Sequence, residues 1–178
     1  MIRIDIPATS ANLGSGFDSL GIALTMCNRV WMEEADELKI TTTDKIKVPT
    51  DETNLIYWAA RHLYQICGKT LPGLHIIQEN NIPMARGLGS SSACIVAGIL
   101  GANRMLGSPM SQSDLINLAA QIEGHPDNTS PAISGGLVAS AMEGKRVYSV
   151  SVPVSGKISF AVMIPPFELK TEDRKSVV

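Results

Sequence analysis

Glycine and serine residues cluster at positions 83–93, directly before a long apolar run at 94–106. Gly87 and Gly89 allow a tight turn and a close approach of the backbone to a ligand. The serines that follow stand where a helix would begin, and serine is a preferred N-cap residue. The first turn of a helix carries unpaired amide N–H groups and the positive end of the helix dipole, so it can bind an anion. The pattern predicts a phosphate-binding loop, with a serine-capped turn that binds nothing as the alternative.

This loop differs from the two best-known nucleotide-binding motifs. It lacks the Gly-Lys-Ser/Thr ending of a Walker A loop, and its third glycine is misplaced for a dinucleotide fingerprint. The following helix is apolar nearly all round and should be buried, with small residues that let its neighbours pack closely. The candidate phosphate-binding residues are Pro83, Met84, Ala85, Arg86, Gly87, Leu88, Gly89, Ser90, Ser91, Ser92 and Ala93.

Two further loops, at 7–18 and 123–131, combine glycines with carboxylates and side-chain amides. Such side chains can bind an ammonium group, a hydroxyl or a metal ion. The alternative is a role in the turns themselves, because Asp and Asn often hydrogen-bond their own backbone there. The candidate side chains are Asn12, Asp18, Glu123, Asp127 and Asn128.

Apolar periodicity predicts the elements that position these loops. Alternation predicts strands at 2–6, 20–26, 29–34, 38–43, 74–78, 137–142, 147–152 and 157–164. Apolar residues spaced by three and four, together with capping residues, predict three helices besides the buried one. The first begins at Asp51 or Thr53 and ends at Gly68. The second begins at Ser111 or Ser113, and a short third one begins at Ala132. Strands that come first and helices that are interleaved later indicate a mixed α+β fold.

Composition narrows the class of protein. The chain has 178 residues and a formal net charge of −2, so no broad basic face argues for nucleic acid as a partner. The longest apolar run is too short to cross a membrane, and the first residues do not resemble a secretory signal. Cys27, Cys67 and Cys94 lack metal-ligand spacing and read as reduced thiols, with Cys94 in the core. We therefore expect a cytoplasmic protein of one or two domains, without a membrane partner.

Three motifs together resemble the galactokinase, homoserine kinase, mevalonate kinase and phosphomevalonate kinase superfamily. They are Pro-Ala-Thr-Ser-Ala-Asn-Leu-Gly at 7–14 with Gly-Phe-Asp at 16–18, the glycine-serine loop at 83–93, and Glu-Gly-His-Pro-Asp-Asn at 123–128. The third motif, with Glu-Leu-Lys-Thr at 168–171, is similar to homoserine kinases in particular. The resemblance runs in order along essentially the whole chain.

The resemblance implies the domain organisation. An N-terminal ATP-binding kinase domain with a ribosomal-protein-S5-like β-α-β layout is expected at 1–153. The partial beginning of a ferredoxin-like C-terminal domain is expected at 154–178. Homoserine kinases are longer and carry a third glycine-rich motif that this sequence does not contain. The chain therefore resembles a C-terminally shortened member of the family.

The implied reaction is phosphorylation of the side-chain hydroxyl of L-homoserine by ATP to O-phosphohomoserine, a step of threonine biosynthesis. The positions that match substrate-binding residues of the family are Asn12, Asp18, Asp127, Asn128 and Arg174. Either aspartate can meet the substrate's ammonium group, and Arg174 can hold its carboxylate in a two-pronged geometry. Asn128 and Thr171 are candidate positioning residues. No catalytic base is assigned, because phosphoryl transfer depends mainly on positioning and charge stabilisation.

The implied cofactors are ATP and Mg²⁺. Backbone amides of 87–92 are expected to hold the phosphates, and Ser92 and Glu123 to bind the metal. For Glu123 the alternative is an exposed carboxylate at a helix end. Asn54 matches a residue near the adenine base, and a helix-capping role is equally open to it. His125, beside a proline in a turn, is expected to be structural.

Two other functions remain open at this stage. One is a different small-molecule kinase of the superfamily, acting on mevalonate or a sugar. The other is a remnant that binds nucleotide or associates without turnover, because the third glycine-rich motif of homoserine kinases is missing from this sequence. Without a second domain, an apolar face would be exposed and would favour a homodimer or aggregation.

Overall fold

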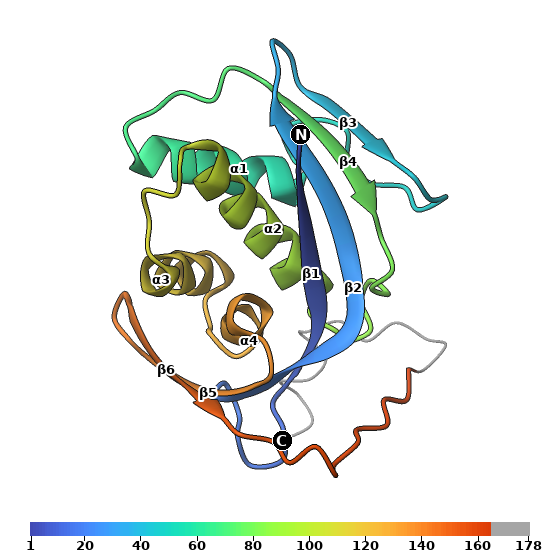
Figure 1. Ribbon diagram of the computed structural model, residues 1–178, viewed down its shortest axis with the longest axis vertical. Helices are drawn as coiled ribbons and strands as arrows, with labels where there is room; N and C mark the ends of the chain where they lie inside the picture. The colour runs from blue at the N-terminus through green and yellow to red at the C-terminus, as the bar shows by residue number, and fades with distance from the viewer. Residues whose placement is uncertain (165–178) are drawn as a thin grey trace.

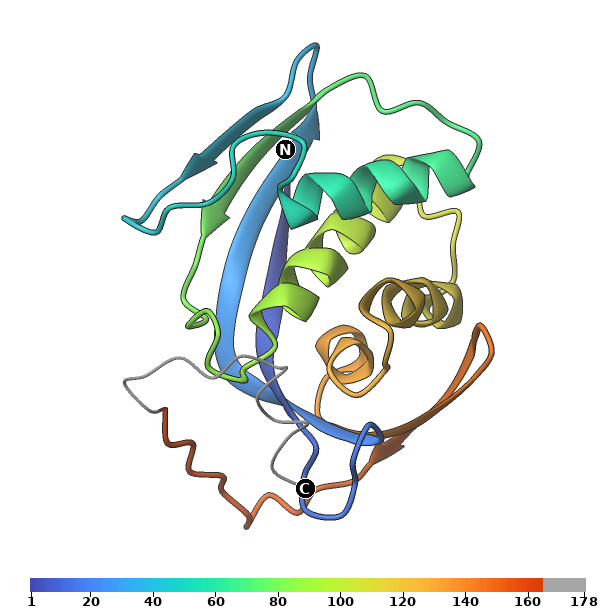
Figure 2. The ribbon, with the colours of Figure 1, turned by 180° about the vertical axis from the view of Figure 1, so that it is seen from behind.

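The computed structural model describes residues 1–164, which form a curved mixed sheet with four helices on one side of it (Figures 1 and 2). The strands are β1 (Ile2–Ala11), β2 (Leu20–Glu34), β3 (Lys39–Thr42), β4 (Leu74–Glu79), β5 (Leu137–Glu143) and β6 (Arg146–Val152). The helices are α1 (Leu55–Ile66), α2 (Ser90–Met105), α3 (Gln112–Glu123) and α4 (Thr129–Ser134). The predicted α+β class is confirmed.

The long strand β2 organises the sheet. β1 pairs with it antiparallel along one edge, while β4 and β5 pair antiparallel with its two ends along the other edge. β3 extends the sheet beside β4 in the parallel sense, and β6 forms a hairpin with β5. The six strands therefore run in the order β3-β4-β2-β5-β6, with β1 beside β2.

Two predictions about these first strands were wrong. The segment 7–11 was expected in a loop but continues β1, because its backbone pairs with β2 after a register shift between Pro7 and Thr9. The segments 20–26 and 29–34 were expected as two strands but form the single strand β2. Both errors arise from long-range pairing, which keeps polar residues such as Thr9 in the sheet.

α2 lies at the centre of the helical layer, where both α1 and β1 contact it. Its buried residues include Val96, Ala97 and Ile99, which are fully inaccessible to solvent. A Cβ on Gly98 would come within 2.3 Å of the carbonyl oxygen of Ile56 in α1. The small residue therefore permits the close helix packing that the sequence predicts.

The helix boundaries correct several expected caps. Asn54, rather than Asp51 or Thr53, caps α1 by accepting hydrogen bonds from the N–H groups of Ile56 and Tyr57. α2 has no serine cap, because Gly89 is its N-cap residue and the serines occupy its first turn. Ser111 caps α3 in a capping box with Asp114, as one of the two expected alternatives. The short helix α4 begins at Thr129, three residues before the expected start.

The strand expected at 157–164 was also wrong. These residues adopt no regular structure, and Ile158, Phe160 and Val162 are exposed. Their alternation resembles a strand, but a strand also needs a neighbour for its backbone groups. β6 ends at Val152, close to the predicted boundary at 153. The assignment of 154–178 to a second domain stays a prediction. In the described part of the chain, no helix has the length and apolar character needed to cross a membrane.

Candidate functional site

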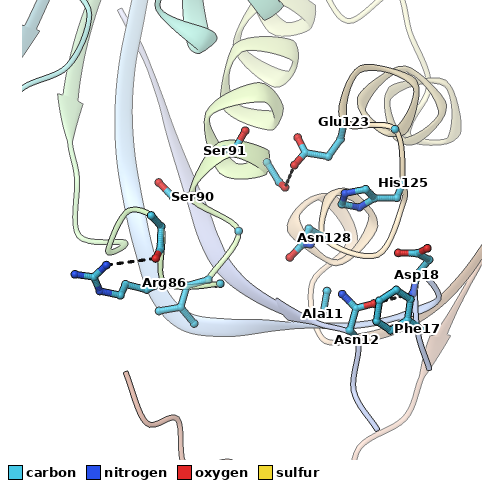
Figure 3. Close-up of a pocket in the computed structure, with 16 residues that line it drawn as sticks. Ala11, Asn12, Phe17, Asp18, Arg86, Ser90, Ser91, Glu123, His125 and Asn128 are labelled. Atoms are coloured by element: carbon cyan, nitrogen blue, oxygen red, sulfur yellow. Dashed lines mark hydrogen bonds between the residues drawn. The ribbon is translucent and has the colours of Figure 1, made fainter. Parts of the chain in front are cut away.

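The three segments that carry the candidate residues, at 7–18, 83–93 and 123–131, surround one cavity of about 380 Å³ at the N-terminal end of α2 (Figure 3). Arg86, Ser90 and Ser91 approach it from the glycine-serine loop, and Asn12, Phe17 and Asp18 from the β1–β2 loop. The residues that line the cavity are Ala11, Asn12, Phe17, Asp18, Ala85, Arg86, Gly87, Leu88, Gly89, Ser90, Ser91, Ser92, Glu123, Gly124, His125 and Asn128. Segments that are far apart in the sequence thus form a single site.

The glycine-serine loop is held by backbone geometry. Gly89 has a φ of +65°, and a Cβ there would lie 2.0 Å from the Oγ1 atom of Thr9. The N–H of Thr9 donates a hydrogen bond of 3.1 Å to the carbonyl of Leu88, which ties the loop to β1. The first-turn amides of α2 lie at the cavity, and such amides have no partners within their own helix. This geometry is suited to an anionic ligand.

Most of the predicted loop residues line the cavity, from Ala85 to Ser92. Pro83, Met84 and Ala93 do not line it, and Ala93 packs in the hydrophobic core. Arg86 lies at the rim and donates a hydrogen bond to the carbonyl of Ala85. The part of the loop that lines the cavity is therefore shorter than the sequence motif.

Ser92 and Glu123 meet at the cavity wall. The buried hydroxyl of Ser92 donates a hydrogen bond of 2.9 Å to Oε1 of Glu123, the last residue of α3. A hydroxyl and a carboxylate are hard oxygen ligands of the kind that Mg²⁺ takes, and Mg²⁺ usually completes its shell with water and phosphate oxygens. The two side chains therefore fit the predicted metal-binding role, and the cavity beside them leaves room for phosphate oxygens.

Asn12 and Asp18 are arranged by one hydrogen bond. Both residues have positive φ angles, of 60° and 51°, a conformation that Asn and Asp tolerate better than most side chains. Oδ1 of Asn12 accepts a hydrogen bond of 2.8 Å from the backbone N–H of Asp18. This contact leaves the exposed Asp18 carboxylate at the cavity, where it can meet a cationic group.

Asn128 lies between these two sides of the cavity (Figure 3). Its Oδ1 accepts a hydrogen bond of 2.8 Å from the hydroxyl of Thr9. Because the oxygen of the amide is engaged in this way, the orientation of the side chain is fixed and its Nδ2 group is the donor on the other side. β1 thus positions both the glycine-serine loop and Asn128.

Asp127 was predicted to contact the substrate, but the structure places it behind the cavity wall. Its side chain is fully buried, and its Oδ1 atom forms a short hydrogen bond with Nδ1 of His125. Its Oδ2 atom has no hydrogen-bond partner among residues 1–164. His125, which was expected to be structural, also lines the cavity. The geometry therefore supports Asp127 as a residue that positions His125.

The electrostatics of His125 follow from this contact. The hydrogen bond to Asp127 raises the pKa of His125 above its usual value, and the negative charges of Asp127, Glu123 and Asp18 act in the same direction against the effect of burial. His125, Thr9 and Phe17 are the side chains that sequence reasoning missed as parts of the site. All three lie within motifs recognised in the sequence, and that was the signal by which they could have been found. A motif in a polar turn does not show which of its side chains faces the cavity.

A second cavity of about 290 Å³ lies beside the first. Asn54 lines it, but both ends of the Asn54 amide are engaged, because Nδ2 donates to the carbonyl of Pro49 while Oδ1 caps α1. The capping interpretation is therefore correct, and its role beside adenine stays a prediction. Arg174 and Thr171 lie outside the described residues.

Comparison with known proteins gives one family and a consistent set of relatives. Residues 54–136 match the GHMP kinases N terminal domain family. The chain is 44% identical over 180 residues to the homoserine kinase of Clostridium botulinum (strain 657 / Type Ba4), covering all of this chain and 60% of that protein. It is 43% identical to the homoserine kinase of Caldicellulosiruptor bescii, with 59% of that protein covered. The chain thus spans about 60% of the length of the curated relatives it matches.

Solved structures of homoserine kinases are similar to this chain as well. A putative homoserine kinase from Listeria monocytogenes is similar with a TM-score of 0.75 and 37% identity, over 90% of this chain and 61% of that one. The homoserine kinase of Cytophaga hutchinsonii gives a TM-score of 0.81 and 29% identity, over 98% and 58%. The mevalonate kinase of Methanococcus jannaschii has a TM-score of 0.64 at 15% identity, over 85% of this chain and 56% of that one, and shares the fold alone.

Proposed function

From the match of residues 54–136 to the GHMP kinases N terminal domain family, we propose that the chain is the ATP-binding part of a homoserine kinase. The proposed reaction transfers a phosphoryl group from ATP to the side-chain hydroxyl of L-homoserine, giving O-phosphohomoserine for threonine biosynthesis. The relatives named above support this choice of substrate. The observation that carries the proposal is the joining of three separate loops around one cavity at the N-terminus of α2.

The two ends of the cavity suit two different ligands. At one end, the amides of Gly87 to Ser92 and the helix dipole would hold the phosphates of ATP. Ser92 and Glu123 would bind Mg²⁺ there, which when bound neutralises phosphate charge. No lysine of the Walker type contributes to this loop. Charge stabilisation by this chain therefore rests on backbone amides and the residues around them.

At the other end, the polar side chains suit an amino acid that carries a hydroxyl group. Asp18 would pair with the ammonium group, and Asn12 holds the backbone of Asp18 in place. Asn128, fixed by Thr9, would orient the hydroxyl by a hydrogen bond. Asp127 would act through His125 rather than by direct contact. Arg174 remains the proposed partner of the carboxylate and Thr171 a proposed positioning residue.

No general base is needed in this scheme. An asparagine amide cannot accept a proton at neutral pH, so Asn128 would serve by orientation. Bringing the hydroxyl into line with the phosphoryl group accounts for much of the catalysis in phosphoryl transfer. As the bond from the hydroxyl oxygen to the γ-phosphorus forms, the bond from that phosphorus to the β–γ bridging oxygen would break and ADP would leave. The hydroxyl proton would pass to an oxygen of the transferred phosphoryl group.

The proposal also includes a cytoplasmic location and assembly as a homodimer. The three cysteines are free thiols in the structure, which supports a cytoplasmic location. Exposed apolar side chains on β6, among them Tyr148 and Val150, support self-association as a homodimer. Light scattering that finds only monomers over a wide concentration range would contradict the dimer.

The test is an ADP-release assay on the 178-residue chain with ATP, Mg²⁺ and L-homoserine. Mevalonate and galactose serve as parallel substrates, and ATP binding is titrated on the same sample. Turnover with homoserine alone supports the proposal. Turnover with mevalonate or galactose instead would assign another kinase activity of the superfamily. ATP binding without turnover would make the chain a nucleotide-binding remnant. The absence of both ATP binding and turnover would overturn the proposal.

A further inference from the structure

The second cavity opens next to the phosphate end of the first. The two cavities share Ala85, Ser90 and Ser91, so a ligand bound at the start of α2 can reach into both. Apolar side chains such as Val48, Ile82 and Cys94 form much of its lining. A flat, largely apolar ring that is joined to a phosphate chain fits a site of this kind.

Gln78 is the unusual residue in its wall. It lies on β4, where the side chains of Leu74, Ile76 and Gln78 face the core in strict alternation. An apolar residue would be expected at the third of these positions. Gln78 is only 2% exposed, and its Nε2 group has no hydrogen-bond partner among the described residues. Burying an amide without a partner is unfavourable, so this residue calls for a functional explanation.

The other amide side chains that line the cavity are already engaged. Asn54 uses its oxygen to cap α1 and its nitrogen to donate to Pro49. Asn80 donates through its Nδ2 group to Asp44. Gln78 is therefore the amide of this wall whose nitrogen is buried without a partner within residues 1–164.

We propose that Gln78 recognises the purine base of the bound nucleotide through its terminal amide. An amide presents a donor and an acceptor side by side, which complements adjacent acceptor and donor atoms on one edge of adenine. The nitrogen and oxygen of such an amide can exchange places by rotation about the terminal bond. Gln78 thus determines base specificity, while the loop at the start of α2 holds the phosphates. This inference rests on the proposed use of ATP.

The test compares Gln78→Met with the unaltered chain. Methionine has a similar length and volume but offers no amide, so the shape of the wall is largely kept. Binding of ATP, GTP and inorganic tripolyphosphate is measured by titration calorimetry. Tripolyphosphate probes the phosphate end alone. Gln65→Met, an exposed substitution on α1, is the matched control.

The expected result is an approximately tenfold loss of ATP affinity in Gln78→Met, with tripolyphosphate affinity unchanged and the preference for ATP over GTP reduced. Its thermal midpoint should be equal to or above that of the unaltered chain, because an unpaired buried amide is removed. Equal ATP affinity in both proteins, or parallel losses for ATP and tripolyphosphate, would overturn the role of Gln78 and leave the proposed function standing. If the unaltered chain binds neither ATP nor tripolyphosphate, both the inference and the proposed function fail.

Discussion

The hydroxyl of Ser92 and the carboxylate of Glu123 lie 2.9 Å apart and join the first turn of α2 to the last residue of α3. This contact brings together two oxygen-bearing side chains, of the kind that Mg²⁺ takes as ligands, from segments that are distant in the sequence. It also connects the proposed phosphate-binding end of the cavity to the loop that carries His125 and Asn128.

Ser92→Ala should weaken binding of ATP in the presence of Mg²⁺ by about tenfold, which corresponds to roughly 1.4 kcal/mol. Binding of ATP without metal should change less than twofold, because the backbone amides remain in place. Titration calorimetry with and without Mg²⁺ measures both values. Ser91→Ala is the control, since no hydrogen bond joins Ser91 to Glu123 in the described structure. Equal losses with and without metal would remove Ser92 from the metal site.

Gly89→Ala should destabilise the protein and weaken phosphate binding. The new Cβ would overlap Oγ1 of Thr9, which itself holds Asn128. Gly107→Ala is the matched control, because Gly107 has a positive φ of 81° but no atom within 4 Å of an added Cβ. Backbone strain should cost each variant about 1 kcal/mol. We expect overpacking to cost Gly89→Ala about 2 kcal/mol more.

Urea unfolding of the two glycine variants provides the measurement. If they lose the same stability, contact with Thr9 is not what requires glycine at position 89. A tripolyphosphate titration then shows whether the geometry of the loop has changed.

His125→Phe should lower the free energy of unfolding by about 3 kcal/mol, because it removes the close partner of a buried carboxylate. Among the described residues, the Asp127 carboxylate would keep only a 3.4 Å contact from Nδ2 of Asn128. Adding Asp127→Asn to this variant should restore part of the loss, since a neutral amide is less costly to bury. Urea unfolding of both single variants and the double variant gives the coupling.

His62→Phe is the control for this series, because His62 stacks on Trp58 and has no buried carboxylate as a partner. It should change stability by less than about 0.5 kcal/mol. A double variant no more stable than His125→Phe alone would show that the charge of Asp127 is not what His125 satisfies.

Cys94 should react slowly with alkylating reagents. Burial, with a further contribution from the negative charge of Glu123, raises the pKa of its thiol from 9.0 to about 11. Only the thiolate reacts, so labelling at pH 8 should be about a hundredfold slower than for a thiol with the ordinary pKa. The rate should increase as the pH rises toward 11.

Iodoacetamide labelling followed by mass spectrometry measures this rate, in a chain whose other two cysteines are replaced by serine. Cys94 lines the second cavity, so ATP should slow the reaction further. Labelling at the rate of a free thiol would contradict the raised pKa of the Cys94 thiol.

The sequence predicted the composition of the site better than its geometry. The glycine-serine loop, Asn12, Asp18, Glu123 and Asn128 could be named because side-chain chemistry and motif order point to them. The inward direction of His125 and the burial of Asp127 could not, because both sit in one polar turn and packing decides which faces the cavity. The same limit explains Gln78, whose position on β4 was predicted but whose unpaired amide was not.

Errors in the fold also have a common physical origin. Thr9 and the residues beside it were assigned to a loop from their polarity, yet pairing with β2 makes them part of a strand. The residues at 157–164 alternate like a strand but have no neighbouring strand in the described structure. Asn54 replaced the expected caps because the carboxylate of Asp51 already accepts hydrogen bonds from Thr53. In each case the outcome depends on contacts that local patterns do not contain.

The position of β2 in the sheet has a consequence for how the chain folds during synthesis. Leu20 pairs with Ala139, so the first residues of β2 have no partner on this side until a strand more than a hundred residues later has been synthesised. Contacts of such large sequence separation slow folding, because the closure of a long loop must precede them. The early strands β1 and β2 can pair soon after they leave the ribosome, but the edge of β2 at residues 20–22 stays open until β5 emerges. During that interval the edge can pair wrongly with other chains, and chaperone binding would be most useful there.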